Sequence, residues 1–456
     1  MQTNILEYLD ATARRVPEKL AFSNGPEGLT FREVHTQARA IGSGLLELGA
    51  AGEPVVVFME RHPKMAAGFF GVVYAGCFYV PIDGEMPSFR VELIFQQLKP
   101  RFVLCDEKTR EQAQSLAPQG AHVLPYDQLA ASAINEDALV RVRRNALDTD
   151  PIYIVFTSGS TGVPKGVAAC HRSVLDYIER LDEVLDVTED TIFGYQTPLY
   201  FDACLKELYS TIRCGSTTYL IPKQLFSFPV KLVEYLNEYK INTVCWVVSA
   251  LTMISGFKVL DKHIPEYFHT VAFGSEVFPI KQFKLWRAAL PNARFINLYG
   301  PTEATGMSCW YEVDREFADD EVLPIGRPFP NTGLLLLTDE DRPAAPGEPG
   351  EICLRGTCLT LGYYGDFQRT NEVFVQNPLN KAYPELVYRT GDIGKLNDQG
   401  ELVFLTRKDN QIKHMGHRIE LGEIEVVAAA GEGVRGVCCL YEKEKKRLIL
   451  CYEGEC

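Results

Sequence analysis

The sequence predicts an α/β protein with a large lobe of two layered α/β subdomains, a small β-barrel-like subdomain, a hinge and a truncated small α+β lobe. Short β-rich runs alternate with amphipathic helical stretches, a pattern typical of layered α/β folds with mainly parallel sheets. The chain has 456 residues, 46% of them hydrophobic. That length exceeds what one hydrophobic core usually holds, so at least two packed units are expected.

The expected buried strands are PVVVFM, RFVLCD, YIVFT, NTVCWVV and HTVAFG, which begin at residues 54, 101, 153, 242 and 269. The longest uncharged run, Met65 to Ile82, contains Pro81 and three glycines. This run is interpreted as a buried helix that leads into the strand FYVPID, rather than as a membrane span.

The residue pattern of the sequence changes near Gly333, where glycines begin to separate short expected strands such as TGLLLLTDE, GEICLRG and ELVFLTR. These strands predict a smaller antiparallel β unit at about 333–406. The polar segment LTRKDNQIKH then favours a junction between a large lobe, 1–408, and a small lobe, 409–456.

Composition excludes several classes of function. A formal net charge of -14 and a pI near 5.2 offer no broad basic field, so nucleic acid is not an expected partner. The 13 cysteines form no paired CxxC sets, which favours reduced thiols in a cytoplasmic enzyme. Charged residues interrupt the N-terminal segment where a signal peptide would need an apolar core. No membrane association is expected.

The most informative segment is YIVFTSGSTGVPKGV, residues 153–167, in which a predicted strand opens into hydroxyls, glycines and a lysine. This composition favours a phosphate-binding loop, because glycines let the backbone approach an anion while hydroxyls and a lysine donate to it. The alternative is an ordinary glycine-serine surface loop. The spacing does not match GxxxxGK[ST], which disfavours a P-loop ATPase. The candidate phosphate-binding residues are Thr157, Ser158, Gly159, Ser160, Thr161, Gly162, Lys165 and Gly166.

This segment resembles the phosphate loop of the adenylate-forming enzymes, which include acyl-CoA synthetases, luciferases and nonribosomal peptide synthetase adenylation domains. Further motifs follow in the order of that family over nearly the whole chain. They are LTFRE, YAGCFYVPID, YFDA, NLYGPTEAT, GEPGEICLRG, YRTGD and RKDNQIKHMGHRIELGEIE. The forms YVPID, YGPTEAT and RIELGEIE are most similar to the amino-acid-activating branch, including D-alanine:carrier-protein ligases.

The resemblance implies a site for ATP and Mg²⁺. Tyr299 offers an aromatic face for adenine, and Glu303 offers a hard oxygen ligand for Mg²⁺. Asp392 can accept from both ribose hydroxyls, although an aspartate after glycine is usually a turn residue. The implied catalytic residues are Lys165, Thr302 and Glu303, and the remaining implied ATP-binding residues are Gly274, Ser275, Glu276, Gly300 and Arg407.

Asp202, in the segment YFDACLKELY, is the candidate partner of the substrate amine. It resembles the aspartate that pairs with the α-ammonium group in amino-acid-activating members of the family. Fatty-acid activators have no ammonium to pair. A carboxylate facing a pocket is expected to need a cationic partner. The alternative is an ordinary helix N-cap.

Lys206 stands four residues after Asp202, where the family places a residue of the side-chain pocket. It could pair with an acidic substrate side chain, or simply make an i,i+4 contact with Asp202. The alternative is a substrate with a small or aromatic apolar side chain, which would pack on the hydrophobic residues of the pocket. The implied substrate-binding residues are Asp202, Ala203, Lys206, Trp246, Val271, Phe273, Leu298, Gly306 and Met307.

The resemblance implies attack of an amino acid carboxylate on the α-phosphorus of ATP, and then transfer to the phosphopantetheine thiol of a carrier protein or domain. The small lobe is expected to rotate about a hinge at Asp409. The family's late catalytic lysine is not found, so the chain is expected to be truncated and to bind ATP better than it forms adenylate. The alternatives are an acyl-CoA synthetase-like or luciferase-like enzyme, and a nucleotide-binding module without turnover.

Overall fold

The computed structural model describes residues 2–159, 163–408, 411–415, 417–429, 434–442 and 445–454. Ser160, Thr161, Gly162 and the expected hinge residue Asp409 lie outside this part of the chain. Within it, none of the helices combines the length and the apolar character that a membrane-spanning helix requires.

The first large sheet has seven strands, and its parallel centre is the β4-β3-β5-β6 array. The predicted strands PVVVFM, RFVLCD and YIVFT are confirmed as β3, β5 and β7. In order across the sheet the strands are β18 (Gly362–Tyr363), β8 (Lys165–Cys170), β7 (Pro151–Thr157), β4 (Phe78–Asp83), β3 (Pro54–Met59), β5 (Phe102–Cys105) and β6 (His122–Pro125).

The second large sheet has nine strands, of which the central ones are parallel. NTVCWVV and HTVAFG are confirmed as β11 and β12, although Val248 already begins the following helix. In order the strands are β15 (Arg327–Pro328), β14 (Cys309–Glu312), β13 (Arg294–Tyr299), β12 (Thr270–Gly274), β11 (Thr243–Val247), β9 (Ile192–Tyr195), β10 (Thr217–Leu220), β1 (Leu20–Ser23) and β2 (Gly28–Thr30).

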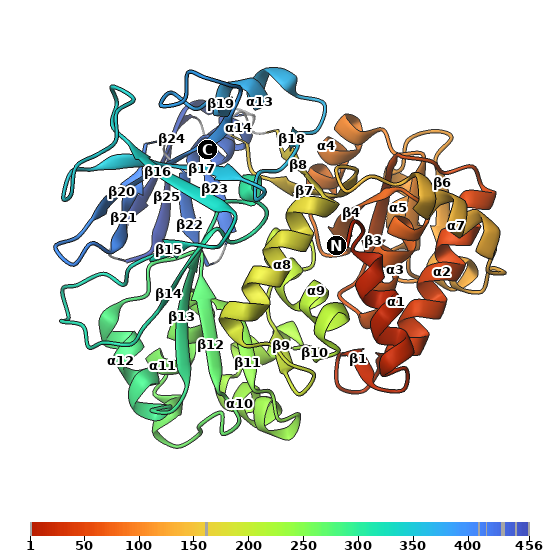
Figure 1. Ribbon diagram of the computed structural model, residues 1–456, viewed down its shortest axis with the longest axis horizontal. Coiled ribbons are helices and arrows are strands. Elements are labelled where there is room, and N and C mark those ends of the chain that lie inside the picture. Colours follow the sequence, from red (N-terminus) through yellow and green to blue (C-terminus); the bar gives the residue numbers. More distant parts are fainter. Residues whose placement is uncertain are drawn as a thin grey trace.

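Helices flank and separate these two sheets, with α8 and α9 in the middle of the molecule (Figure 1). Buried residues of α8 and α9 share one hydrophobic cluster with those of α1, α2 and α3. The N-terminal helices are α1 (Leu6–Arg15), α2 (Phe31–Glu47), α3 (Pro63–Tyr74), α4 (Ser88–Leu98), α5 (Arg110–Leu116), α6 (Tyr126–Ala130) and α7 (Glu136–Asn145). The later ones are α8 (His171–Leu185), α9 (Leu205–Cys214), α10 (Pro229–Glu238), α11 (Val248–Gly256), α12 (Ile280–Ala289), α13 (Phe367–Val373) and α14 (Leu421–Ala429), with 3₁₀ turns η1 (Asp202–Cys204), η2 (Lys223–Ser227), η3 (Val259–Asp261) and η4 (Thr302–Ala304).

Local sequence explains several of these boundaries. The LTFRE motif starts α2 with a capping box, in which Thr30 Oγ1 accepts from Glu33 N and the Glu33 carboxylate accepts from Thr30 N. Two otherwise unpaired helix donors are thereby satisfied. The uncharged run from Met65 to Ile82 forms most of α3 and then β4, as predicted.

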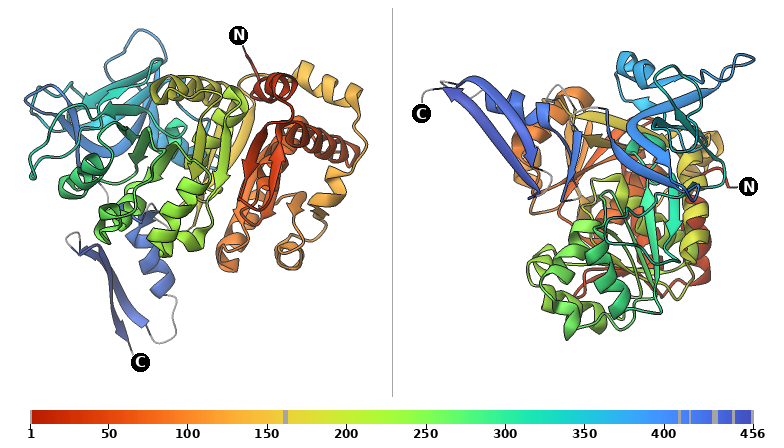
Figure 2. Two further views of the ribbon diagram at one scale, coloured as in Figure 1. Left: turned by 90° about the horizontal axis from the view of Figure 1, so that it is seen from below. Right: turned by 90° about the vertical axis from the view of Figure 1, so that its left-hand side faces the viewer.

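A third sheet and two hairpins complete the fold, and the predicted fold class is confirmed. The third sheet consists of β16 (Thr332–Leu337), β17 (Gly350–Gly356), β20 (Leu386–Leu396), β19 (Phe374–Gln376) and β21 (Leu402–Arg407), with all pairings antiparallel. The hairpins are β22 (Gln411–His414) with β23 (His417–Glu420), and β24 (Val434–Glu442) with β25 (Arg447–Gly454). Figure 2 shows α14 and the second hairpin projecting from the rest of the molecule.

Candidate functional site

Two adjoining cavities lie where parallel strands of both large sheets end, next to β20, β21 and β22. Their volumes are about 460 and 700 Å³. Open sheets of this kind bind ligands beyond the carboxyl ends of their strands. The first cavity is lined by the predicted residues Thr157, Ser158, Asp202, Ala203, Ser275, Gly300, Thr302, Gly306, Met307, Asp392 and Arg407. The second is lined by Ser275, Glu276, Leu298, Tyr299, Asp392 and Arg407.

The predicted phosphate loop leaves the end of β7 and returns as β8. Thr157 pairs with Lys165 at the last position of this antiparallel ladder. The hydroxyl of Thr157 is buried and has no hydrogen-bond partner in the described part of the chain. A Cβ atom on Gly159 would lie 2.2 Å from the carbonyl oxygen of Val163, so the turn requires glycine there.

Lys165 and Glu303 form an ion pair beside this loop, with 3.5 Å between Nζ and Oε1. The carboxylate of Glu303 is fully buried and also accepts from the hydroxyl of Tyr363 at 2.8 Å. Nζ of Lys165 lies 3.4 Å from the same hydroxyl and 5.1 Å from the ring centroid of Tyr363. The sequence interpretation did not include Tyr363, whose place depends on pairing of β18 with β8.

Glu303 and Thr302 fit a magnesium site in the chemistry of their donor atoms. Both side chains are buried and supply oxygen, the ligand atom that Mg²⁺ prefers. The Glu303 carboxylate and the Thr302 hydroxyl are thus suitable oxygen donors for that cation.

Asp392 joins the end of β13 to the third sheet. Its Oδ2 accepts from the hydroxyl of Tyr299 at 2.6 Å, and its Oδ1 accepts from Arg407 Nη1 at 2.6 Å. Asp392 and Arg407 face each other in the ladder between β20 and β21. Burial and the neighbouring Asp392 raise the pKa of Tyr299 well above its usual value, so its phenol stays protonated. Each carboxylate oxygen can still accept from a sugar hydroxyl.

The segment after β12 contributes backbone to both cavities. A Cβ atom on Gly274 would lie 2.3 Å from the carbonyl oxygen of Leu298, so the neighbouring strand approaches closely here. Ser275 follows with a positive φ of 68°. The carboxylate of Glu276 accepts from Ser249 N at 2.8 Å, at the start of α11. These contacts fix the rim of the second cavity.

Asp202 lies at the first position of η1 and lines the first cavity. The alternative that it caps a helix is wrong, because the N-cap residues are Phe201 for η1 and Cys204 for α9, and neither cap uses a side chain. The apolar residues of α9, Leu205, Leu208, Tyr209 and Ile212, are buried. Asp202 is therefore placed at the cavity, apart from those residues.

Lys206 borders a separate, small cavity of about 10 Å³. The residue is 3% exposed, and its positive charge acts on the neighbouring Glu207. The predicted residues Ala203, Trp246, Phe273, Leu298 and Met307 line the same cavity. Val271 is buried in the cluster that contains Trp246 and Phe273 but does not line the cavity.

Glu207, which the sequence interpretation did not single out, lies next to Lys206 and is completely buried. Neither carboxylate oxygen has a hydrogen-bond partner in the described chain. Burial raises the pKa of this carboxyl to about 7, and the positive charges of Lys206 and Arg61 oppose the shift. Arg61 is partly buried and donates to the carbonyl oxygen of Tyr195 at 2.5 Å.

Residues of the first C-terminal hairpin also reach the site. Gln411, Lys413 and His417 line the first cavity. The ring of His417 packs edge-on against Phe201, with 5.4 Å between centroids, and Nζ of Lys413 lies 5.9 Å from the centroid of Tyr299. The segment after residue 410 therefore helps to close the cavity over the aspartate-bearing turn.

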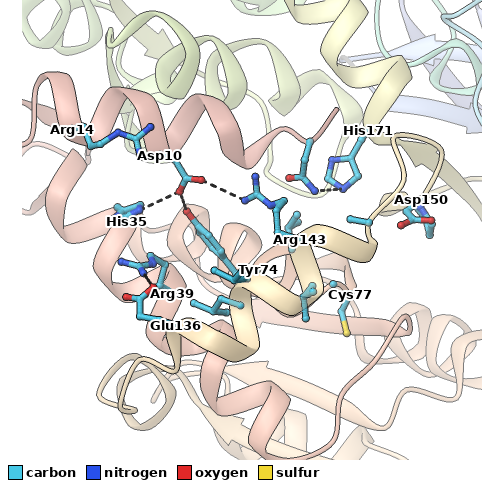
Figure 3. A pocket seen from close by; sticks show the side chains of 18 residues that line it. Asp10, Arg14, His35, Arg39, Tyr74, Cys77, Glu136, Arg143, Asp150 and His171 are labelled. Carbon is cyan, nitrogen blue, oxygen red and sulfur yellow. Dashed lines mark hydrogen bonds and ion pairs between the residues drawn. The ribbon is translucent and has the colours of Figure 1, made fainter. Parts of the chain in front are cut away.

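Another cavity, of about 350 Å³, lies among the N-terminal helices (Figure 3). Several of its charged groups are paired with one another: Asp10 accepts from Tyr74 and His35 and lies 3.5 Å from Arg143. Arg39 pairs with a glutamate of α7. These contacts connect α1, α2, α3 and α7, and we assign this cavity no part in the chemistry.

Comparisons with known proteins agree with this geometry. The family model described as AMP-binding enzyme matches residues 9–364. The L-proline--[L-prolyl-carrier protein] ligase of Streptomyces coelicolor is 30% identical over 456 residues, which cover 94% of this chain and 83% of that protein. Indigoidine synthase of Dickeya dadantii is 30% identical, with 97% of this chain and 30% of that protein covered. Tyrocidine synthase 1 of Brevibacillus parabrevis is 30% identical, with 94% and 38% covered.

Solved structures of similar fold include the crystal structure of IdnL1, with a TM-score of 0.85 and 26% identity over 100% of this chain and 92% of that one. The synthetase FmoA3 in its alpha-methyl-L-serine-AMP bound form has a TM-score of 0.80 and 27% identity, with 92% of this chain and 46% of that one covered. The chain thus spans less than half the length of several relatives that it matches.

Proposed function

Because this chain belongs to the AMP-binding enzyme family, we propose that it is an ATP-dependent ligase that activates the carboxylate of an amino acid as an aminoacyl-AMP. The observation that carries this proposal is the position of Asp202. Its turn lines the same cavity as Thr302, Asp392 and the end of the phosphate loop. A carboxylate here suits a substrate that brings an ammonium group.

In the proposed reaction, a carboxylate oxygen of the amino acid attacks the α-phosphorus of ATP. A phosphorus–oxygen bond forms there, the bond to the bridging oxygen breaks, and pyrophosphate leaves. Thr157, Ser158 and Lys165 donate to phosphate oxygens, and Asp392 with Arg407 holds the ribose. Glu303 and Thr302 would hold Mg²⁺, which neutralises charge on the phosphates when bound.

The chain's own contribution to rate is positioning and preorganised charge, since no covalent intermediate with a side chain is required. Tyr299, Ser275 and Glu276 line the second cavity, which we assign to adenine, and Gly274 precedes Ser275 at the end of β12. Asp202 orients the α-ammonium group, and with it the carboxylate that attacks phosphorus.

The second step is transfer of the aminoacyl group to the phosphopantetheine thiol of a carrier protein. The thiol sulfur attacks the acyl carbon, the mixed anhydride bond breaks, and AMP leaves. This transfer step is supported by the relative from Streptomyces coelicolor, which is named as a ligase of L-proline and a carrier protein. The large lobe ends near residue 408 in this proposal, and the hinge is at Asp409.

The side-chain pocket is assigned to Ala203, Lys206, Trp246, Phe273 and Leu298, and we assign Lys206 to an acidic substrate side chain. Lys206 is almost completely buried beside this small cavity, a costly position for a charge that a substrate carboxylate would relieve. The cavity of about 10 Å³ means that the flexible lysine stem must move to admit such a side chain.

A panel of non-hydrolysable aminoacyl-sulfamoyl adenosines tests the function without requiring turnover. We expect at least one aminoacyl member to bind about 100-fold more tightly than AMP, because one molecule then makes the contacts of both the nucleotide and the amino acid. Affinities no better than that of AMP across the whole panel would contradict the proposal.

A further inference from the structure

Arg369 lies beside Gly159, at the start of the phosphate loop. Its Nη1 is 3.6 Å from the position that a Cβ atom on Gly159 would occupy. The guanidinium therefore approaches the loop backbone where glycine leaves room. The side chain is partly buried and, within the described chain, forms no ion pair.

The segment that carries Arg369 is fastened to the strand that carries Lys165. Tyr363 pairs with Val167 across β18 and β8, and Tyr364 N donates to the carbonyl oxygen of Gly166 at 2.8 Å. Asp366 then caps α13 by accepting from Arg369 N at 3.0 Å. Arg369 is thus held near the loop by hydrogen-bonded backbone.

Arg369 and Lys165 line a common cavity of about 560 Å³ beside the loop. The acidic residues of this cavity are already engaged: Asp366 caps α13, and Glu372 accepts from Gln368 Nε2 at 3.3 Å. Lys165 is paired with Glu303. The cation with unused donors on this side of the loop is therefore Arg369, among the residues described for the cavity.

We propose that Arg369 binds the pyrophosphate end of the nucleotide, that is, the β- and γ-phosphates of ATP and the pyrophosphate that leaves. The inference rests on the proposed function, which places a triphosphate along this loop. A guanidinium donates two parallel hydrogen bonds to phosphate oxygens, a geometry that a single ammonium does not reproduce. Arg369 thus supplements Lys165, which lines the same cavity.

Calorimetric titration of the whole chain with ATP, AMP and inorganic pyrophosphate, each with Mg²⁺, tests this assignment in Arg369→Met. We expect the Kd of ATP and of pyrophosphate to rise about 10- to 100-fold, the range for a lost charged hydrogen bond. The Kd of AMP should not change, because AMP lacks the phosphates concerned. For Arg369→Lys, the Kd of ATP should lie between those of the wild type and Arg369→Met. Lys381→Met removes an exposed charge outside the cavity, and its Kd values should match those of the wild type.

An unchanged affinity for ATP in Arg369→Met would overturn the inference while leaving the proposed function intact. Equal weakening of ATP and AMP would also overturn it, since that result indicates a general change in the site. If the wild-type chain bound neither nucleotide, the proposed function itself would fail, and this inference with it.

Discussion

The ammonium of Lys165 lies 3.5 Å from the buried carboxylate of Glu303, and the hydroxyl of Tyr363 donates to the same carboxylate oxygen. This contact joins the end of the phosphate loop to the NLYGPTEAT motif. It orients the glutamate oxygens before any ligand arrives, which would reduce the reorganisation required by the metal and phosphate binding that we propose.

Replacing Glu303 by alanine should remove the dependence of ATP affinity on Mg²⁺. We expect a loss of about 3 kcal/mol in stabilisation of the reacting phosphates, because one oxygen ligand of the metal disappears. Titration with ATP in the presence and absence of Mg²⁺ measures how strongly the ATP affinity depends on the metal.

Tyr363→Phe is the matched control, since it keeps the glutamate charge and removes only one hydrogen bond. It should weaken binding by about 1 kcal/mol and retain the response to Mg²⁺. A normal Mg²⁺ response in Glu303→Ala would mean that the metal site lies elsewhere.

Lys206→Met should lower the preference for an acidic substrate over its isosteric amide. We expect the difference in binding free energy between glutamyl- and glutaminyl-sulfamoyl adenosine to fall by about 2–3 kcal/mol, the range for a buried charged hydrogen bond. Lys223→Met serves as a control, because Lys223 lines the first cavity but is paired with Asp83 and Glu85. A wild-type preference for phenylalanyl or alanyl analogues would refute the acidic-substrate assignment.

Glu207 should make stability fall as the pH rises. Its pKa is raised by burial to about 7 in the folded chain, against about 4.3 when unfolded. Between these values the unfolded chain releases a proton that the folded chain keeps, so ionisation favours unfolding. The contribution is fully present below about pH 4 and is lost as the pH rises through 7.

Glu207→Gln cannot ionise and should therefore flatten this decline. The free energy of unfolding from urea titration, compared between pH 5 and pH 8, should fall in the wild type by up to about 3 kcal/mol more than in the variant. Asp182, whose pKa burial raises to about 6, titrates in both proteins and cancels from the comparison. Equal declines would show that Glu207 is ionised throughout.

The layered fold could be predicted from the sequence because its strands are continuous apolar runs. PVVVFM and HTVAFG are buried along almost their whole length, so the composition of each run indicates its environment. The composition of the uncharged run that forms α3 and β4 likewise indicates that both are buried. Glycine and proline interrupt this run too often for a membrane span.

The site could be predicted only where its residues belong to contiguous motifs. Tyr363 and Arg369 reach the loop through the pairing of β18 with β8, which joins residues nearly 200 positions apart in sequence. The charge of Arg61 likewise acts on Glu207, which lies far from it in the sequence. No local pattern encodes such proximity, because it results from the order of strands in the sheet.

The central claim, recognition of an amino acid by Asp202, is tested most directly by one pair of ligands. The best aminoacyl-sulfamoyl adenosine and its deaminated counterpart differ only in the α-ammonium group. The wild-type chain should bind the amino form about 10- to 100-fold more tightly, and Asp202→Asn should lose that preference, because a charged hydrogen bond is removed in each case. Equal affinity of the wild type for both ligands would contradict the account.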